Sequence, residues 1–262
     1  MRIAILGGLA LACPALVAAP AHAGLAPLPN YSVFLSAGVQ GGGFKGSNGF
    51  GLLDASTAIG IAKADAGTTP APFVSSEAVL LENGASLTAG ASASLSYYAR
   101  VTGGAIGAPV GLAITAKLHA DAIDGGSRAF LSITDMTTLS VIFRAERCVN
   151  LGPGGVCTQP GGDLTLKSFG FTAPAGHLLL IDMLAQTVGE ANAGGGGGAF
   201  VDPYIAVTQP YAATYGVEFS PGITQSLASG VPEASTWAMM LVGLAGLGLA
   251  SQRRRDRRGA AA

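Results

Sequence analysis

Few residues of this chain have the types and spacing that catalysis needs. Nucleophilic hydrolysis combines a serine or cysteine with a histidine base and an orienting acid, and no Gly-x-Ser-x-Gly turn occurs in the sequence. His119 falls on the polar face of an alternating segment, and His177 follows a Pro-Ala-Gly turn. We interpret both as surface side chains, and the sequence therefore predicts no catalytic residue.

Carboxylates are the other groups that could do chemistry. Zinc sites need clustered His and Cys, and the sequence has no such cluster. Asp121 and Asp124 flank a turn but lack the dense Asp/Asn ladder of an EF-hand. An Asx-turn is the simpler interpretation, so we expect no cofactor, with Ca²⁺ left open. A glycosidase would need two facing carboxylates about 5–10 Å apart, and sequence alone cannot pair them, which leaves a secreted polysaccharide-acting enzyme as an alternative.

Exposed aromatic rings on a sheet could contact sugars. Alternation assigns Tyr97 and Tyr215 to the core, whereas Tyr98 points the other way from Tyr97. The single tryptophan, Trp237, lies in the C-terminal segment. Tyr98 is therefore the candidate glycan contact if the protein is a glycan-binding module.

Two cysteines are predicted to form a disulfide. Cys148 and Cys157 are separated by Val149–Val156, a segment rich in glycine that is suited to a turn. An oxidising compartment favours a bridge between them, which would stabilise the fold by about 2–3 kcal/mol. A metal or catalytic pair is the alternative, and it lacks a third ligand nearby in the sequence.

Period-two alternation indicates that strands position these residues. Between Val110 and Ala120, apolar residues alternate with small or polar ones, as in a strand with one buried face. The same pattern recurs in three further segments, and a fourth reads as a central strand; these are Leu95–Val101, Leu139–Phe143, Tyr215–Phe219 and Leu178–Leu184.

Gly/Pro turn signals separate these runs, and no convincing helix of ten or more residues is present. We interpret Leu53–Ala66 as one turn or a short helix, and Gly194–Gly198 as a flexible loop before a strand at Tyr204–Thr208. Short strands with Gly/Pro turns predict an all-β fold, a β-sandwich or a jelly roll.

The first 23 residues have the pattern of a secretory signal peptide. Arg2 precedes an apolar run that ends in Ala21-His22-Ala23, which fits the small-residue cleavage pattern. We predict export through the Sec translocon and cleavage by signal peptidase between Ala23 and Gly24. A retained membrane helix is disfavoured by Pro14 and Pro20, and a lipoprotein at Cys13 by the residues before it.

The C-terminal segment predicts a second membrane element. Val231-Pro232-Glu233-Ala234 precedes Trp237, which begins a 14-residue apolar run ending at Ala250. At about 1.5 Å per residue this helix spans roughly 21 Å, less than the hydrocarbon core of about 30 Å. A stop-transfer cluster follows: Arg253, Arg254, Arg255, Arg257 and Arg258. Arginine-rich flanks stay cytoplasmic, so the rest of the chain would face the periplasm.

This tail resembles the PEP-CTERM sorting tail of Gram-negative bacteria, in its Trp-Ala-Met-Met variant. The resemblance rests on Val231-Pro232-Glu233, the entry at Trp237, the apolar helix and the arginines. It implies recognition and cleavage by an exosortase, a membrane-embedded cysteine transpeptidase-like enzyme, and a link to exopolysaccharide and biofilm. Ala234 departs from the family pattern, which usually has a second proline there. An uncut tail anchor in the inner membrane is the alternative.

Composition excludes several other classes. The chain has 262 residues, 11% of them charged, and a net charge of −1. Residues 24–230 carry 8 basic and 13 acidic side chains, a balance that disfavours nucleic acid. We predict an exported non-catalytic envelope or matrix protein that ends at the cell surface. Its parts are a signal peptide, a β-rich domain, a linker, a sorting tail and a tail end: 1–23, 24–223, 224–230, 231–258 and 259–262.

Overall fold

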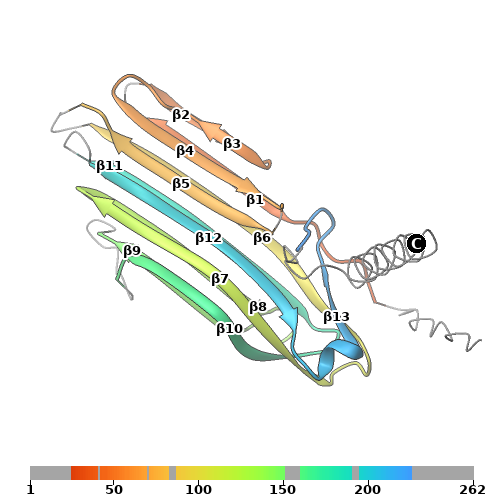
Figure 1. Cartoon of the computed structure of the whole chain (residues 1–262). Coiled ribbons are helices and arrows are strands. Elements are labelled where there is room, and N and C mark those ends of the chain that lie inside the picture. Colours follow the sequence, from red (N-terminus) through yellow and green to blue (C-terminus); the bar gives the residue numbers. More distant parts are fainter. Residues whose placement is uncertain are drawn as a thin grey trace, which may run out of the picture.

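The computed structural model describes residues 25–40, 42–69, 71–82, 87–150, 160–190 and 195–225. In these ranges the chain forms strands and a 3-10 helix, η1 (Tyr211–Ala213). The strands make two antiparallel sheets that lie one over the other (Figure 1). The all-β sandwich predicted from alternation is therefore confirmed.

Sheet A has β11 at its centre and β9 at one edge. Its order is β2 (Gly43–Ser47), β1 (Ser32–Val39), β6 (Thr88–Gly103), β11 (Leu178–Glu190), β8 (Gly125–Asp135) and β9 (Ser140–Val149). A further strand, β13 (Tyr215–Phe219), pairs with the second half of the long β6, next to the part that β1 pairs. The apolar run beginning at Leu178 is thus a central strand, as predicted.

Sheet B covers sheet A and has β10 and β3 at its edges. Its order is β10 (Gly162–Pro174), β7 (Pro109–Ile123), β12 (Gly196–Val207), β5 (Phe73–Leu80), β4 (Gly60–Gly67) and β3 (Gly51–Asp54). One edge of the sandwich consequently places β9 of sheet A near β10 of sheet B, and the other places β2 near β3.

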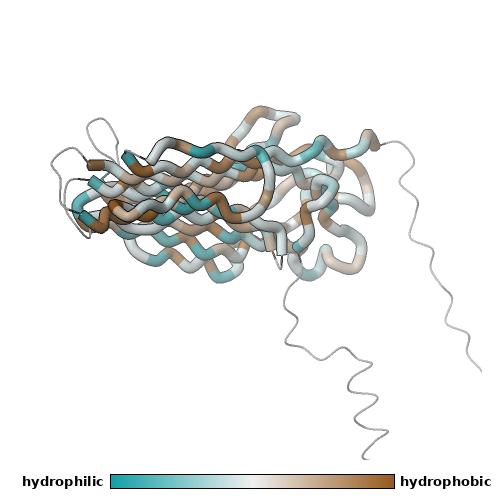
Figure 2. The backbone as a smooth tube through the Cα atoms, turned by 90° about the horizontal axis from the view of Figure 1, so that it is seen from above, coloured by the Kyte–Doolittle hydropathy of each residue, from teal (hydrophilic) through white to brown (hydrophobic). Residues whose placement is uncertain are grey.

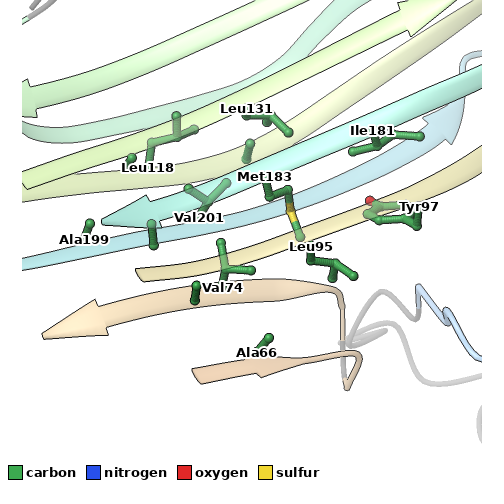
Figure 3. Close-up of a cluster of buried hydrophobic side chains, with 14 of the residues drawn as sticks. Ala66, Val74, Leu95, Tyr97, Leu118, Leu131, Ile181, Met183, Ala199 and Val201 are labelled. Atoms are coloured by element: carbon green, nitrogen blue, oxygen red, sulfur yellow. The ribbon is translucent and has the colours of Figure 1, made fainter. Parts of the chain in front are cut away.

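The core lies between the sheets and is made by the faces that alternation predicted. β7 buries all six of its predicted apolar positions from Val110 to Ala120. Hydrophobic and hydrophilic positions mix along the strands (Figure 2). Figure 3 shows Leu118 and Val201 of sheet B facing Leu131 and Met183 of sheet A. Burying such side chains is the main stabilising term, at about 25 cal/mol per Å² of apolar surface.

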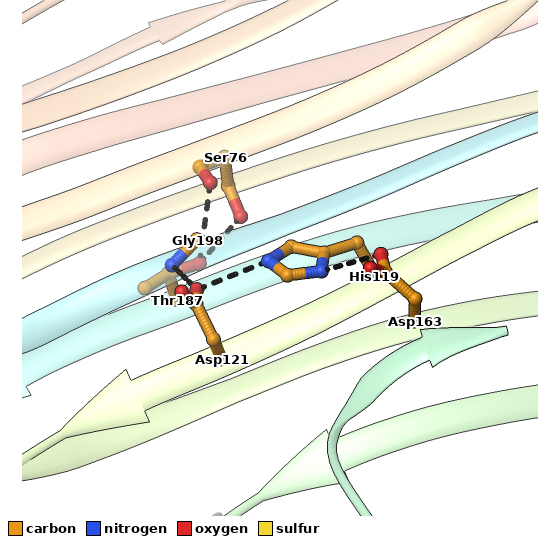
Figure 4. Close-up of polar contacts among 6 residues, drawn as sticks. All are labelled: Ser76, His119, Asp121, Asp163, Thr187 and Gly198. Carbon is orange, nitrogen blue, oxygen red and sulfur yellow. Dashed lines mark hydrogen bonds and ion pairs between the residues drawn. The ribbon is translucent and has the colours of Figure 1, made fainter.

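One polar contact crosses this core. The hydroxyls of Ser76 in β5 and Thr187 in β11 are 2.8 Å apart, and both residues are buried (Figure 4). Thr187 Oγ1 also lies 3.4 Å from the Ser76 carbonyl oxygen. Each hydroxyl thus satisfies the other, which removes the cost of burying an unpaired polar group.

Two local predictions were wrong. Leu53–Ala66 contains the ends of β3 and most of β4 instead of a helical turn. Gly196–Gly198 begin β12 and pair with β5 and β7 instead of forming a loop. A Cβ on Gly197 would lie 1.9 Å from the Asp121 carbonyl oxygen, and one on Gly196 would lie 2.0 Å from that of Ala78. These glycines are needed because the neighbouring backbones approach too closely for a side chain.

The sandwich has two unlike ends. At the glycine end, β11 ends and β12 begins, with Gly189 and Gly196–Gly198 close to neighbouring backbones. At the terminal end, the segments 25–31 and 220–225 contact the sheets near β13 (Figure 1). Ser220 Oγ donates to the Pro29 carbonyl at 2.7 Å and accepts from Tyr98 N at 2.8 Å.

Candidate functional site

The residues predicted to direct export lie outside the described part of the chain. This applies to the cleavage site at Ala21, Ala23 and Gly24 and to the whole sorting tail, residues 231–258. Within the ranges that the structure describes, no helix is both long and apolar enough to cross a membrane. The structure nevertheless shows from which point of the sandwich the tail departs.

The chain stays anchored to the sandwich as far as Gln225. Gln225 Nε2 donates to the Tyr97 hydroxyl at 3.1 Å, and its Oε1 accepts from Ile205 N at 2.8 Å. Burial raises the pKa of the Tyr97 phenol, so this hydroxyl stays neutral. Thr224, the first residue of the predicted linker, donates to the Thr68 carbonyl at 3.1 Å. Six residues lead from Gln225 to Val231, a reach of at most about 21 Å.

The start of the domain is fixed at the same end. Arg100 is buried and donates to the Ala26 carbonyl at 2.6 Å and to Glu218 in β13 at 2.8 Å. Glu218 follows Val217 on a strand that leads directly to Ser220. Residues near the predicted signal cleavage site and residues near the sorting tail therefore share one hydrogen-bonded network.

His119 lies on the outer face of sheet B, as its position in the alternation predicted (Figure 4). Its Nδ1 is 2.9 Å from Asp163 Oδ1, and its Nε2 is 3.4 Å from Asp121 Oδ1. Asp121 Oδ1 also accepts from Gly198 N at 2.7 Å. Asp121 thus stabilises the pairing of β7 with β12. Asp124 occupies the turn between β7 and β8 at φ +46°. No group of three or more His, Cys, Asp or Glu suited to a metal occurs among the described residues.

His177 pairs with a buried carboxylate at the terminal end. Its Nδ1 is 2.7 Å from Asp135 Oδ2, and Asp135 Oδ1 accepts from Thr137 N at 2.8 Å. Burial opposes ionisation of Asp135, but these hydrogen bonds together lower the pKa of its carboxyl. A histidine oriented by a buried acid is two thirds of a hydrolase triad. In the described ranges, no hydroxyl or thiol is hydrogen-bonded to His177.

Two further candidates stay predictions. Tyr98 is half-buried on the outer face of sheet A, on β6, three strands away from β9. Cys148 is buried near the end of β9, and its predicted partner Cys157 lies outside the described residues.

A groove lies along the β9–β10 edge of the sandwich. Its volume is about 510 Å³, within the range of roughly 300–1,000 Å³ typical of ligand sites. Residues of both edge strands line it: Ile142, Phe143, Arg144, Ala145, Glu146, Arg147, Leu164, Leu166 and Phe169. Its walls are largely apolar, and its charged groups all come from β9.

Irregularities in both edge strands shape this groove. In β9 the register with β8 shifts between Val141 and Phe143, so that Ile142 is an extra residue and Val141 is exposed. In β10 the register shifts between Leu166 and Phe169, and Phe169 packs against Phe143 with ring centroids 5.3 Å apart. The predicted alternation from Leu139 to Phe143 is therefore wrong at its first two positions: the bulge turns Val141 to solvent, and Leu139 lies in the turn before β9 at φ +55°.

Arginines gather around one buried carboxylate on the outer face of the β8–β9 hairpin, the face opposite the core residues Ala129, Leu131 and Phe143. Glu146 accepts from Arg128 Nε at 2.8 Å and from Arg144 at 3.3 Å. Both guanidinium groups also lie over the Phe130 ring, at 5.3 and 5.0 Å from its centre. We call Arg128, Phe130, Arg144 and Glu146 the arginine cluster. Pairing and stacking hold its guanidinium groups in place before any ligand binds.

Sequence reasoning missed the arginine cluster. β8 and β9 form a hairpin whose register pairs Phe130 with Glu146 and Ser132 with Arg144. The signal available in the sequence was charge distribution: β8, β9 and β10 contain four of the eight basic residues of 24–230 and three of its 13 acidic ones. The acidic excess of the domain therefore lies elsewhere.

Comparison with known proteins identifies the tail. Residues 230–255 match the PEP-CTERM protein-sorting motif. No curated protein matches the chain. Solved structures that were matched include the family 11 xylanase from Neocallimastix patriciarum, 14% identical with a TM-score of 0.20, covering 62% of this chain and 97% of that one. A loop-swap mutant of Xyn11A from the same organism is 13% identical with a TM-score of 0.19, covering 62% and 98%.

The motif match confirms the resemblance seen in the sequence. It covers the Val-Pro-Glu element, the apolar run and the first arginines. A PEP-CTERM tail implies an exported precursor that is anchored in the membrane before an exosortase processes it.

Proposed function

We propose that this chain is an exported, non-catalytic protein of the cell envelope or extracellular matrix, whose folded β-sandwich is delivered by sorting of its tail. The observation that carries the proposal is the PEP-CTERM motif at residues 230–255. In this proposal, signal peptidase cuts before Gly24 after export through the Sec translocon, and the exosortase cuts near Val231–Ala234. The arginines from Arg253 onward keep the precursor facing the periplasm until then.

The geometry of the domain supports this order of events. Ala26 and Gln225 are both held at the terminal end of the sandwich. Because the chain reaches Val231 within about 21 Å of Gln225, a membrane enzyme cutting there would work close to that end. Both membrane-directed segments can then enter one bilayer without spanning the length of the sandwich.

Two further points favour a structural role over catalysis. Both histidines of the domain have Nδ1 within 3 Å of a carboxylate, and His119 also has Asp121 near Nε2. The edge strands β9 and β10 carry bulges and charges that discourage edge-to-edge aggregation. Such a domain suits a protein that accumulates outside the cell, where a Cys148–Cys157 disulfide would persist and where exopolysaccharide and biofilm are the expected surroundings.

Sorting is tested in the native host with and without its exosortase. The expected result is a processed species in the surface or medium fraction of the wild type, and a precursor retained in the membrane of the deletion strain. Replacing Trp237–Ala250 with a polar sequence should abolish the membrane-bound intermediate in both strains. An identical distribution in the two strains would contradict sorting by exosortase.

Absence of catalysis is tested on the full chain in detergent micelles with a panel of polysaccharides and acyl esters. No turnover above the buffer rate is expected. Turnover that disappears when one carboxylate, such as Asp135 or Glu146, is changed to its amide would show an enzyme instead.

A further inference from the structure

We infer that the outer face of sheet A binds a neutral, β-1,4-linked polysaccharide that lies across the strands from β1 to β8. This inference rests on the proposed function, because it names the polymer that the delivered domain would hold outside the cell. It is carried by the register of four neighbouring strands, by the exposed ring of Phe34 and by the distribution of charge over the two outer faces of the sandwich.

Strand register aligns an apolar row on the outer face of sheet A. Each of β1, β6, β11 and β8 contributes one residue that pairs with the next: Phe34, Ser94, Leu184 and Phe130. The alternation of burial places all of them on the face opposite the core. Adjacent strands are about 4.8 Å apart, so the row is roughly 14 Å long. It therefore offers one continuous contact to several adjacent units of an extended polymer.

Phe34 provides the ring on which a sugar can stack. Its side chain is 52% exposed, and β2 pairs with β1 only from Leu35 onward, so no strand continues the row beyond Phe34. Sugar rings expose C–H groups on their faces and hydroxyls on their rims, and an aromatic ring suits such a face. Stacking there removes apolar surface of both partners from water.

Polar rows flank the apolar row on both sides. Residues two apart on a strand share a face, so each polar row is about 7 Å from the apolar one. One row is Ser36, Ser92, Gln186 and Arg128, and the other is Ser32, Ser96, Asp182 and Ser132. Ser96 Oγ donates to Asp182 Oδ1 at 2.6 Å, which orients this carboxylate. Donors and acceptors thus lie on both sides of the apolar row, where a flat pyranose chain presents its equatorial hydroxyls.

Charge favours a neutral polymer. The arginine cluster contributes two cations and one carboxylate beside these rows, and Asp182 adds a second carboxylate, so the charges balance. The outer face of sheet B instead has six of the 13 carboxylates of the domain and only two of its eight cations; these are Asp54, Asp65, Glu77, Asp121, Asp163 and Asp202, with Lys63 and Lys117. A polycation would be drawn to sheet B, and a polyanion would be repelled by the acidic domain. Short-range contacts decide where a neutral polymer binds, and sheet A provides them.

A protein ligand suits this face less well. Serine occupies half of the positions in the three rows, and serine is depleted at protein–protein interfaces. A peptide cannot add to the sheet there either, because β1, β6, β11 and β8 each have a partner strand on both sides.

The test is isothermal titration calorimetry of the full chain in detergent micelles with cellohexaose. Two matched probes are maltohexaose, which has the same units in a curved α-1,4 chain, and the β-1,4-linked hexamer of glucuronic acid, which adds a carboxylate to each ring. We expect cellohexaose to bind with an affinity that salt does not change, and the other two to bind at least tenfold more weakly. Equal or tighter binding of either matched probe, or no binding of cellohexaose, would overturn the inference.

Variants place the binding on the apolar row. Phe34→Ser should weaken binding about tenfold, whereas Phe34→Tyr keeps the ring and should change it less than twofold. Ser94→Lys puts a long side chain across the row and should also weaken binding at least tenfold. The matched control is Phe169→Ser, which removes a ring that is 49% exposed at the β9–β10 edge and should change binding less than twofold. Unchanged binding in both Phe34→Ser and Ser94→Lys, or an equal loss in the Phe169 variant, would contradict the assignment.

Further readouts separate binding from folding, self-association and sorting. Urea unfolding should change little in Ser94→Lys because residue 94 faces outward, so its loss of binding is not a loss of fold. A wild-type dimer in sedimentation that Ser94→Lys dissociates would assign this face to a second copy and overturn the inference. A correctly sorted protein that does not bind cellohexaose would also overturn it and leave the proposed function intact. Binding by a protein whose distribution ignores the exosortase would overturn the sorting alone.

Discussion

At the glycine end of the sandwich, strands are held by backbone approach, whereas at the terminal end they are held by side chains. Gly196 and Gly197 leave no room for a Cβ between β12 and its neighbours. At the other end, Asp135, Arg100, Ser220 and Gln225 each bind backbone or a side chain of a different segment. The difference teaches that the stability of the terminal end depends on the ionisation of side chains and on the attached chain ends, whereas the stability of the glycine end does not. The following substitutions test this contrast.

The largest effect is expected at the glycine end. Gly197→Ala places a Cβ against the Asp121 carbonyl, and the strands must separate to admit it. We expect the free energy of unfolding to fall by about 3 kcal/mol, the upper part of the usual range for overpacking, as measured by urea unfolding. The control is Gly90→Ala in β6, where the nearest atom would be 3.9 Å away and a change under about 1 kcal/mol is expected. Equal effects would show that the approach of the backbones is not limiting.

The terminal end is expected to depend on pH through Asp135. The folded state lowers the pKa of this carboxyl below its unfolded value, so its contribution is fully present above the unfolded pKa of about 3.9 and is lost as the pH falls through the folded pKa. Asp135→Asn should lower the free energy of unfolding at pH 7 by about 1–3 kcal/mol.

The same variant should also lose part of the acid dependence. Urea unfolding from pH 7 down to pH 3 measures this, with Asp65→Asn on β4 as the control. Parallel pH profiles for the wild type and Asp135→Asn would contradict the role of the ionised carboxylate.

A smaller effect is expected from the polar contact in the core. Thr187→Val leaves the Ser76 hydroxyl buried without its partner, which should cost about 1–2 kcal/mol. Adding Ser76→Ala removes the unpaired group, so the double variant should be less destabilised than the sum of the single ones. Additive losses in the double-mutant cycle would mean that the two hydroxyls do not stabilise each other.

The smallest effect is expected at Ser220, which links the two chain ends. Ser220→Ala removes the hydrogen bond to the Pro29 carbonyl and the one from Tyr98 N, and should cost about 1 kcal/mol. Because the contact holds a terminal segment, hydrogen exchange should quicken at residues 25–31 with little change in the central strands. Uniform quickening across both sheets would argue that this end is part of the global core.

Much of the fold could be predicted because alternation reports directly on burial. β7 follows the simple period of two and was found with its faces correctly assigned, and the continuous apolar run of β11 was found as a central strand. The start of β12 was missed because glycines give no hydropathy signal. Glycine is required there because neighbouring backbones approach too closely for a side chain, which the sequence does not reveal. The bulge at Ile142 was missed because a shift of register is a property of the strand pair.

The candidate sites differ in the same way. The sorting tail is a local pattern of residues 231–258, so sequence was enough to recognise it. The groove joins β9 to β10, which belong to different sheets, and Arg144 meets Phe130 only across the β8–β9 hairpin. Such a site requires the order and register of the strands before its residues can be brought together.

The central claim, delivery of the domain by processing at both ends, is tested most directly by the intact mass of the protein in each cell fraction of its native host. The account predicts a surface or medium species that begins at Gly24 and ends between Val231 and Ala234. A protein found only in the membrane, with a mass that still includes Trp237 through Arg258, would contradict it and would show a permanently anchored periplasmic domain.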